Sequence, residues 1–282
     1  MWFVDDAFNL VGYAALPLAV LALASAIGRR RGMLVTVGAV GAVWLAFMAS
    51  THLAVVAPVA CRADTIRVVN SNVLLTNDRL PELAAAILPH DPDVIVFEEL
   101  DEDIADVSPE LAAKYPYRFT TDTPWVTIAS RLPLLDQRRL RLPPGFPGYQ
   151  PLTADIEVGG RRLHLIGVHF AAPIGTTAFR EHQEQAAAVT EHLRDVAGPV
   201  VLTGDLNATV TSPLFLRFLW DTGLRSVSDG LFQSQSYWPV PPLIGMRIDH
   251  VLLRDAEVCH TEVFEVPGSD HRAVLADVQL PE

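Results

Sequence analysis

The sequence predicts an α/β (α+β) fold, a four-layer sandwich of two packed β-sheets flanked by helices, preceded by a two-helix transmembrane hairpin. Three observations predict it. Half of the 282 residues are hydrophobic, and the excess lies in two uncharged stretches near the start. After these stretches, short β-rich runs alternate with helix-like runs. Many of the β-rich runs end at Asp, Asn, Glu or His, which is how α/β enzymes present functional groups.

The first 61 residues are predicted to form the hairpin, with helices over about 7–27 and 33–60. No charged residue occurs between Ala7 and Ile27 or between Met33 and Ala60. Each stretch is long enough to cross a bilayer, which takes about 20 apolar residues. A tight basic turn, Arg29–Arg31, joins them.

The positive-inside tendency places this basic turn in the cytoplasm, so we expect the rest of the chain to be extracytoplasmic. A cleaved signal peptide is disfavoured because Asp5 and Asp6, rather than basic residues, precede the first stretch. A lipoprotein cleavage before Cys61 is an alternative, which Pro58 makes less suitable. The predicted location is therefore the cell membrane, with two spanning helices.

Residues 62–282 form the predicted outer domain, and its elements follow from hydrophobic periodicity and turn residues. Pro81 marks a helix start, and Gly159-Gly160 marks a hairpin turn. The predicted helices are Arg79–Leu88, Ile104–Lys114 and Thr176–Val196. The predicted strands are Ile66–Val73, Val94–Phe97, Thr153–Val158, Arg162–Val168, Pro199–Thr203, Arg247–Leu253, Val258–Val266 and Ala273–Leu280. Two β-rich halves with helices outside suit a two-sheet sandwich.

Polar groups at the margins of separate strands form a constellation that a single short motif would not make. They are Asn72, Glu99, His169, the Gly204-Asp205-Leu206-Asn207 turn, Asp249 and Ser269-Asp270-His271. In this order they resemble the endonuclease/exonuclease/phosphatase superfamily, which includes DNase I, apurinic endonucleases, neutral sphingomyelinases and inositol-polyphosphate 5-phosphatases. The resemblance covers roughly Arg67 to Leu280. It implies a four-layer sandwich and a metal-dependent phosphoesterase that hydrolyses its substrate by in-line attack of water.

The resemblance also implies the metal ligands. Glu99 matches the principal ligand, with Asn72 beside it and Asp270 as a further carboxylate. Hard oxygen ligands suit Mg²⁺ or Mn²⁺. Asn70 competes with Asn72, which we prefer because Val-Leu follows it as in the family pattern. Glu98 competes with Glu99, and strand alternation allows only one of them to reach the site.

The catalytic residues implied by the resemblance are His169, Asp205, Asn207, Asp249 and His271. Asp205 matches the position that orients and deprotonates the attacking water, and Asn207 and His169 match groups that contact the phosphate. His271 would bind a phosphoryl oxygen as a cation, with its pKa raised by Asp249.

The substrate is less constrained than the chemistry. Leaving out Arg29–Arg31 and Asp5–Asp6 takes 21 basic residues to 18 and 33 acidic residues to 31, so the outer domain carries −13. This charge works against long nucleic acids. Tyr237 and Trp238, in a Pro-rich loop before Asp249, are candidates for contact with substrate or a bilayer interface. Arg180 is a candidate phosphate contact, although a solvated helix face is the commoner role.

We therefore expect a phosphoester substrate at the membrane, with a lipid or cell-envelope phosphoester favoured over nucleic acid. An extracytoplasmic nuclease is the alternative, and a catalytically inactive binding module of the same fold is the second. No protein partner is indicated. The two cysteines, Cys61 and Cys259, either form a bridge that ties the outer domain to its membrane stem or remain free thiols.

Overall fold

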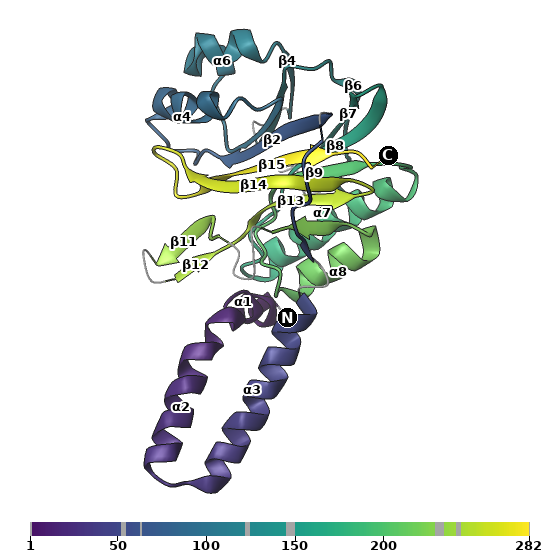
Figure 1. Ribbon diagram of the computed structural model, residues 1–282. Coiled ribbons are helices and arrows are strands. Elements are labelled where there is room, and N and C mark those ends of the chain that lie inside the picture. The colour runs from purple at the N-terminus through teal and green to yellow at the C-terminus, as the bar shows by residue number, and fades with distance from the viewer. Residues whose placement is uncertain are drawn as a thin grey trace.

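A computed structural model describes residues 2–51, 55–62, 64–121, 125–144, 150–228, 234–240 and 244–281. Two mixed β-sheets pack face to face, with helices on their outer surfaces and a long helical hairpin projecting from one end (Figure 1). The predicted fold class, two packed sheets flanked by helices, is confirmed.

The strands fall into two large sheets and a small ribbon. In order across the seven-stranded sheet they are β1 (Val55–Val56), β10 (Arg225–Val227), β13 (Asp249–Arg254), β9 (Val200–Asp205), β8 (Arg161–His169), β7 (Leu152–Val158) and β6 (Leu135–Arg139). The six-stranded sheet runs β14 (Glu257–Glu265), β15 (Arg272–Gln279), β2 (Thr65–Asn72), β3 (Val94–Glu98), β5 (Val126–Ser130) and β4 (Tyr117–Thr120). A separate ribbon pairs β11 (Tyr237–Val240) with β12 (Ile244–Met246).

The central core lies between the two sheets and consists mainly of aliphatic side chains that alternate along the strands. At Gly167 on β8 the two sheets approach closely. A Cβ there would lie 3.1–3.3 Å from methyl or methylene carbons of Val96, Val126 and Ile128 on the opposite sheet. A side chain at this position would therefore push the sheets apart.

Helices cover the two outer faces through separate apolar clusters. One group lies on the six-stranded sheet: α4 (Leu80–Ile87), η3 (Leu88–His90), α5 (Ile104–Val107) and α6 (Pro109–Lys114). The other sheet carries α7 (Thr176–Arg194) and α8 (Pro213–Thr222). The single helix predicted over Ile104–Lys114 is wrong. Ser108 adopts an extended backbone, and its hydroxyl caps α6 by accepting from the Leu111 N–H.

The N-terminal hairpin is bent, which corrects the continuous helix predicted over 7–27. It consists of α1 (Trp2–Asn9), η1 (Val11–Ala14), α2 (Ala15–Ile27) and α3 (Arg31–Thr51). The bend of 59° lies at the break between Trp2–Asn9 and Val11–Ile27, that is, between α1 and η1. Pro17 lies in the first turn of α2, and because it lacks an N–H the α-helical hydrogen-bond pattern is not continued from Pro17 back into η1. The Trp44 indole N–H donates to the Val11 carbonyl at 2.8 Å, which satisfies one group freed by the break.

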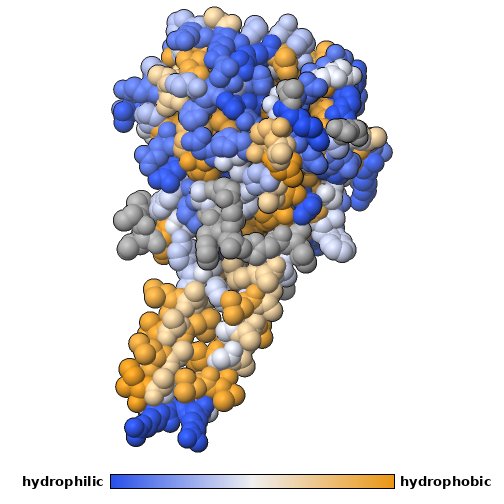
Figure 2. Space-filling model, viewed as in Figure 1, coloured by the Kyte–Doolittle hydropathy of each residue, from blue (hydrophilic) through white to orange (hydrophobic). Residues whose placement is uncertain are grey.

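The second predicted helix also ends earlier than expected, at Thr51 rather than 60. Val55 and Val56 instead pair in parallel with β10, and the Val59 N–H donates to the Val258 carbonyl. The last residues of the predicted hairpin are therefore part of the outer domain. By length and composition Arg31–Thr51 could cross a membrane, and the bent pair Trp2–Asn9 and Val11–Ile27 adds a second candidate if it counts as one span. Figure 2 shows the apolar surface of this hairpin and the hydrophilic residues at its tip.

The first helix, α1, belongs to the outer domain's surface rather than to the hairpin alone (Figure 1). The Asp5 carboxylate is buried and accepts from the Ser212 hydroxyl at 2.8 Å and the Leu214 N–H at 3.0 Å, at the start of α8. Acidic groups are favourable at a helix N-terminus because free N–H groups and the helix dipole meet there. Asp5 thus joins the first helix of the chain to the last.

Cys61 and Cys259 form a disulfide, which decides between the two alternatives left by the sequence. Cys61 precedes β2 and Cys259 lies in β14, an edge strand of the six-stranded sheet. The bridge therefore fixes the segment that leads from the hairpin into the sandwich.

We predict that the denatured full chain exposes no free thiol before reduction and two thiols after it. Because the bridge joins residues 198 apart, replacing both cysteines by serine should lower the free energy of unfolding by about 2–5 kcal/mol. Urea denaturation followed by tryptophan fluorescence measures this change. Two reactive thiols in the unreduced protein would rule the bridge out.

Candidate active site

Strand register brings the predicted site residues to one end of the sandwich. On β9, Asp205 is paired with His169 of the parallel strand β8 and with Asp249 of the antiparallel strand β13. In the other sheet, β2 and β3 run in parallel, so that Asn72 is opposite Glu98. Side chains from both sheets therefore meet where these strands end.

A pocket of about 310 Å³ opens at this point. It is lined by Asn9, Leu74, Glu99, His169, Ala172, Pro173, Ile174, Asp205, Asn207, Tyr237, Met246, Ile248, Asp270 and His271. Six of the eight predicted metal and catalytic residues are among them. Asn72 and Asp249 lie directly behind and contact pocket residues.

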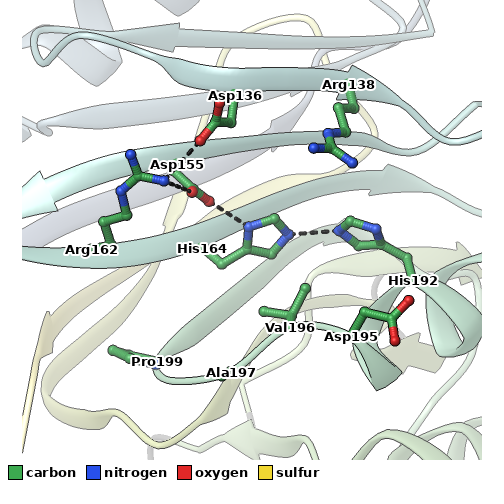
Figure 3. Close-up of a pocket in the computed structure, with 10 residues that line it drawn as sticks. All are labelled: Asp136, Arg138, Asp155, Arg162, His164, His192, Asp195, Val196, Ala197 and Pro199. Carbon is green, nitrogen blue, oxygen red and sulfur yellow. Dashed lines mark hydrogen bonds and ion pairs between the residues drawn. The ribbon is translucent and has the colours of Figure 1, made fainter.

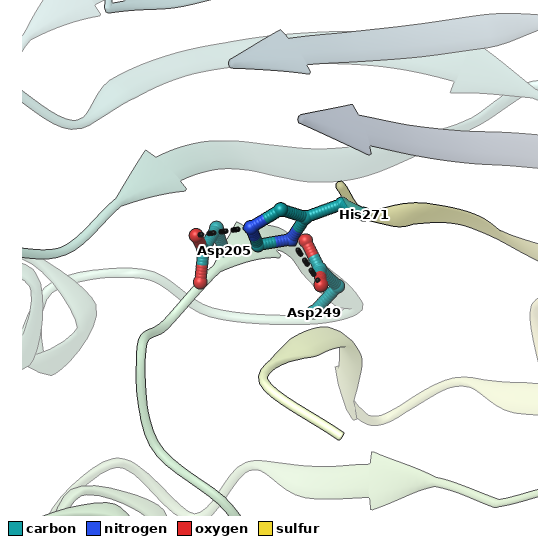
Figure 4. Close-up of side chains that lie close together, drawn as sticks. All are labelled: Asp205, Asp249 and His271. Carbon is teal, nitrogen blue, oxygen red and sulfur yellow. Dashed lines mark hydrogen bonds and ion pairs between the residues drawn. The ribbon is translucent and has the colours of Figure 1, made fainter. Parts of the chain in front are cut away.

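Asp249 and His271 form a buried ion pair (Figure 4). The His271 Nδ1 lies 2.8 Å from an Asp249 oxygen, and its Nε2 lies 3.9 Å from Asp205 and 4.0 Å from Asp270. Burial by itself would lower the pKa of His271, but Asp249 and the other two carboxylates outweigh it and raise the pKa to about 10. His271 is therefore a cation that directs its second nitrogen toward the pocket.

Asp205 is the most strongly oriented carboxylate of the site. Its Oδ1 accepts from the Asn207 backbone N–H at 2.8 Å, and its Oδ2 accepts from the side-chain amides of Asn207 at 3.2 Å and Asn72 at 3.3 Å. Burial and the nearby Asp249 raise the pKa of Asp205 to about 8. In its ionised form a carboxylate with such a pKa is a stronger base than an ordinary aspartate and accepts a proton more readily.

Glu99 and Glu98 point in different directions, as strand alternation predicts. Glu99 lies at the pocket, where its oxygens accept from the Asn72 amide at 3.1 Å and the Leu75 N–H at 2.9 Å. Glu98 is fully buried against Asn70, at 2.6 Å. Burial raises the pKa of Glu98 well above its usual value, and Asp249 and Asp205 raise it further. Glu98 thus lies behind the site, where burial favours its neutral form.

The backbone is strained where functional side chains leave the strands. Glu99 and Asn207 have φ values of 61° and 49°, in the left-handed region that costs free energy for residues other than glycine. Gly204 has a φ of 151°, and a Cβ there would lie 1.8 Å from the Val168 carbonyl oxygen. The glycine before Asp205 is therefore required by the packing of β9 on β8.

The side-chain amides of Asn72 and Asn207 are oriented differently from what their predicted contacts with metal and phosphate require. The Asn72 Oδ1 accepts from the Leu74 backbone N–H, so the amide nitrogen rather than the oxygen faces Glu99 and Asp205. The Asn207 amide nitrogen donates to the Phe170 carbonyl as well as to Asp205. In this arrangement both asparagines orient the carboxylates. Direct contact of Asn72 with metal and of Asn207 with phosphate stays a prediction.

His169 lies between the two sheets' acidic groups, with Nε2 3.8 Å from Glu99 and 3.7 Å from Asp205. Burial lowers the pKa of His169 to about 4, although Glu99 opposes the shift. The imidazole is therefore neutral beside the cationic His271.

The predicted substrate-binding residues separate into two groups. Tyr237 lines the pocket, with its ring centroid 4.8 Å from that of His271. Trp238 contacts the Arg272 guanidinium at 4.2 Å and does not line the pocket, nor does Arg180, which is exposed on α7.

Sequence reasoning missed the pocket's apolar wall and its contact from the hairpin. Pro173 and Ile174 follow β8, Met246 ends β12, and Asn9 comes from α1. Asn9 is a polar residue inside an otherwise apolar stretch, which was the only sequence feature pointing to it.

A larger pocket, of about 380 Å³, lies elsewhere on the seven-stranded sheet (Figure 3). It contains His164, five residues before His169 on β8, or about 16 Å along the strand. Several of its polar groups are paired with one another: Arg162 with Asp155, Asp155 with His164, and His164 with His192. This pairing distinguishes it from the first pocket, where carboxylates converge.

A family model described as the endonuclease/exonuclease/phosphatase family matches residues 69–271. The chain belongs to this family. A UPF0294 protein of Vibrio cholerae is 28% identical over 123 residues, which is 43% of this chain and 41% of that protein. The match thus spans less than half of the curated relative's length.

Solved structures of similar fold cover most of the outer domain. TDP2 of D. rerio, in complex with a single-strand DNA product, has a TM-score of 0.63 at 17% identity over 76% of this chain and 99% of that chain. Sphingomyelinase C of Streptomyces griseocarneus has a TM-score of 0.54 at 19% identity, and the match covers 76% of this chain and 99% of that chain. Beta toxin of Staphylococcus aureus, with bound magnesium ions, has a TM-score of 0.57 at 16% identity, and the match covers 76% of this chain and 99% of that chain. At these identities the likeness shows the fold.

The residues at the pocket fit a hard divalent cation. Glu99, Asp205 and Asp270 present carboxylate oxygens to it, and none of the described residues lining it is a cysteine. Asp205, Asp249 and His271 also have ligand atoms within 4.8 Å of one another. However, the Asp249–His271 hydrogen bond already occupies one oxygen and one nitrogen of that group.

We predict that Asp249 sets the charge of His271. In wild type the imidazole should lose its proton as the pH rises through about 10. In Asp249→Asn, burial dominates, and the pKa should fall below the ordinary histidine value of about 6.5. Titration of ¹⁵N-histidine NMR signals of the full chain in micelles measures both values.

The matched control is Asp270→Asn, because the exposed Asp270 carboxylate lies 4.0 Å from Nε2 and should lower the pKa much less. A wild-type titration near 6.5 would contradict the ion pair.

Proposed function

We propose that the protein is a membrane-anchored, divalent-metal-dependent phosphoesterase, with Mg²⁺ or Mn²⁺ as cofactor. The observation that carries this proposal is the convergence of Glu99, Asp205, Asp270 and the cationic His271 on one pocket. Phosphoester hydrolysis needs a cation on the phosphate, an activated water and positive charge near the developing anionic oxygens. The pocket offers a residue for each requirement.

We assign Glu99 and Asp270 to the metal, with Asn72 orienting Glu99. The bound cation would neutralise charge on the phosphoryl oxygens as a Lewis acid. Asp205, held by Asn207 and Asn72, accepts the proton of the attacking water. His271, kept protonated by Asp249, donates a charge-assisted hydrogen bond to a phosphoryl oxygen. His169, neutral and adjacent to both carboxylates, donates a second.

Direct attack by water is favoured over a covalent intermediate. None of the described residues that line the pocket is serine, threonine or cysteine. Ser269, the nearest hydroxyl in the motif, donates to the Asn72 carbonyl and accepts from the His271 N–H. An inactive binding module is disfavoured because Asp205 and His271 have pKa values suited to proton transfer and anion binding.

The hairpin supports a location at the membrane. Its exposed side chains are predominantly apolar along α2 and α3, and its far tip is hydrophilic (Figure 2). Arg29–Arg31 lie at this tip, where α2 ends and α3 begins. We propose that both apolar segments span the bilayer, with the tip in the cytoplasm and the outer domain, from about residue 55, on the other side. The bend between α1 and α2 then falls near the membrane surface.

We favour a lipid or other cell-envelope phosphoester as substrate. The outer domain's acidic charge opposes long nucleic acids, and an apolar wall borders the pocket, where the Ile174 side chain is 68% exposed. Anchoring beside the bilayer raises the effective concentration of a membrane-borne substrate. The alternative, an extracytoplasmic nuclease, is supported by the fold shared with a DNA-bound structure.

We predict that chelation abolishes phosphoester hydrolysis and that Mg²⁺ or Mn²⁺ restores it. Glu99→Gln removes a carboxylate ligand and should weaken the apparent affinity for Mg²⁺ at least about tenfold. The matched control is Glu98→Gln, which should change this affinity little because Glu98 is already neutral and faces Asn70. Activity that survives EDTA would contradict the metal assignment.

We predict that the full chain in micelles or proteoliposomes hydrolyses a membrane phospholipid faster than plasmid DNA. The assay compares sphingomyelin, glycerophospholipids, inositol phosphates, RNA and plasmid DNA at equal phosphoester concentration. Rapid cleavage of DNA without action on any lipid would reverse the order of the two substrates. Turnover of none of them would favour the binding module.

A further inference from the structure

The active-site pocket has one wall that does not come from the outer domain. Asn9, the last residue of α1, lines the same pocket as Asp205 and His271. In the sequence, the helical hairpin formed by α2 and α3 lies between Asn9 and β2, the strand of the six-stranded sheet that comes first in the chain (Figure 1). The hairpin therefore contributes a polar side chain to the site.

The orientation of the Asn9 amide is fixed by its partner. Its Oδ1 accepts from the Thr209 backbone N–H at 2.9 Å and from the Thr209 hydroxyl at 3.0 Å. Because a backbone N–H can only donate, the atom facing it must be the oxygen. The Nδ2 group is then directed away from Thr209, and among the described residues it has no hydrogen-bond acceptor. Asn9 thus holds a free pair of N–H donors at the pocket.

The helix that carries Asn9 is held on both sides of that residue. Before it, Asp5 accepts from Ser212 and Leu214, and the Phe8 carbonyl accepts from the Thr211 hydroxyl at 2.6 Å. After it, the Tyr13 hydroxyl donates to the Gly245 carbonyl at 2.6 Å and accepts from the Gly245 N–H at 2.7 Å. The donors of Asn9 are therefore preorganised.

The segment that holds α1, residues 209–214, follows directly after the Gly204–Asn207 turn that carries Asp205. Thr209 is two residues after Asn207, which orients Asp205, and Gly245 is next to Met246 at the pocket wall. The position of Asn9 relative to Asp205 is therefore set by a short, hydrogen-bonded path rather than by a flexible linker.

We propose that Asn9 is a substrate-contacting residue, so that the active site is a composite of the membrane hairpin and the outer domain. Its amide donates to an oxygen of the bound phosphoester, a group that accepts hydrogen bonds and carries negative charge. This inference rests on the proposed phosphoesterase function. It also means that the domain boundary predicted at residues 61/62 divides the site.

Two substitutions in the full chain, purified in micelles, test this role. Asn9→Asp keeps an oxygen for Thr209 but replaces the donors by a negative charge, whereas Asn9→Ala removes both the donors and the docking contact. We expect the KM for a phosphoester to rise about tenfold or more in Asn9→Asp and less in Asn9→Ala, with kcat changed less than KM. Thr36→Val on α3, an exposed position, is the hairpin control and should leave both constants unchanged.

Hydrogen exchange of 209–214 separates contact with substrate from a structural role. In Asn9→Asp the protection of this segment should equal that of wild type, because the docking bonds remain. A rise in KM accompanied by lost protection, or a larger effect in Asn9→Ala than in Asn9→Asp, would overturn the inference in favour of docking alone.

Binding of inorganic phosphate in the presence of Mg²⁺, measured by calorimetry, separates failure of this inference from failure of the proposed function. Weaker phosphate binding in Asn9→Asp supports the contact even if no phosphoester is hydrolysed, in which case the proposed function fails alone. Hydrolysis by wild type, with unchanged KM and phosphate affinity in Asn9→Asp, overturns the contact and leaves the function standing.

Discussion

The site depends on the gathering of acidic side chains at one end of the two sheets. Glu98, Asp205 and Asp249 are buried there, with Glu99 and Asp270 at the pocket. Such a group of like charges is unfavourable unless some members are neutral and others are paired. Glu98 is neutral against Asn70, and Asp249 is paired with His271. The remaining negative charge is directed at the pocket, where the proposed divalent cation would offset it. The chemistry and the stability of this end of the fold thus have the same cause.

The sequence was a good guide to most of the strands buried on both faces, although β5 was missed, and to the order of the layers. The predicted strands around Asn72, Glu99, His169 and Asp205 lie within two residues of those observed at each end, because apolar β-branched runs allow few alternatives. It was a poor guide to β4, β6 and α8. The exposed residues of β4 and β6 show no alternation, and α8 depends on a cap from the distant Asp5 as well as on Ser212. The bend after Asn9 and the early end of α3 were also missed, since α1 and the segment Val55–Val56 both contact the outer domain.

The predicted site residues converge where expected because strand register, which alternation and turns determine, places their ends together. Register does not determine side-chain direction at the strained positions. The left-handed backbone at Glu99 sets the direction of its carboxylate, and the hydrogen bond from the Leu74 N–H sets the direction of the Asn72 amide. No local sequence pattern indicates either direction. The failure to recognise Asn9 has another cause. An amide in an apolar segment was interpreted as part of a membrane helix, and only tertiary contact shows which surface it faces.

The bond between Asp5 and Ser212 has a consequence for biosynthesis. The two residues are 207 positions apart, and translation produces the acceptor long before the donor. By the time α8 leaves the ribosome, the residues of α1 and of the hairpin have already been synthesised. The first turn of α8 therefore forms against a helix from the start of the chain, and under the proposed membrane topology this contact would couple the folding of α8 to insertion of the hairpin.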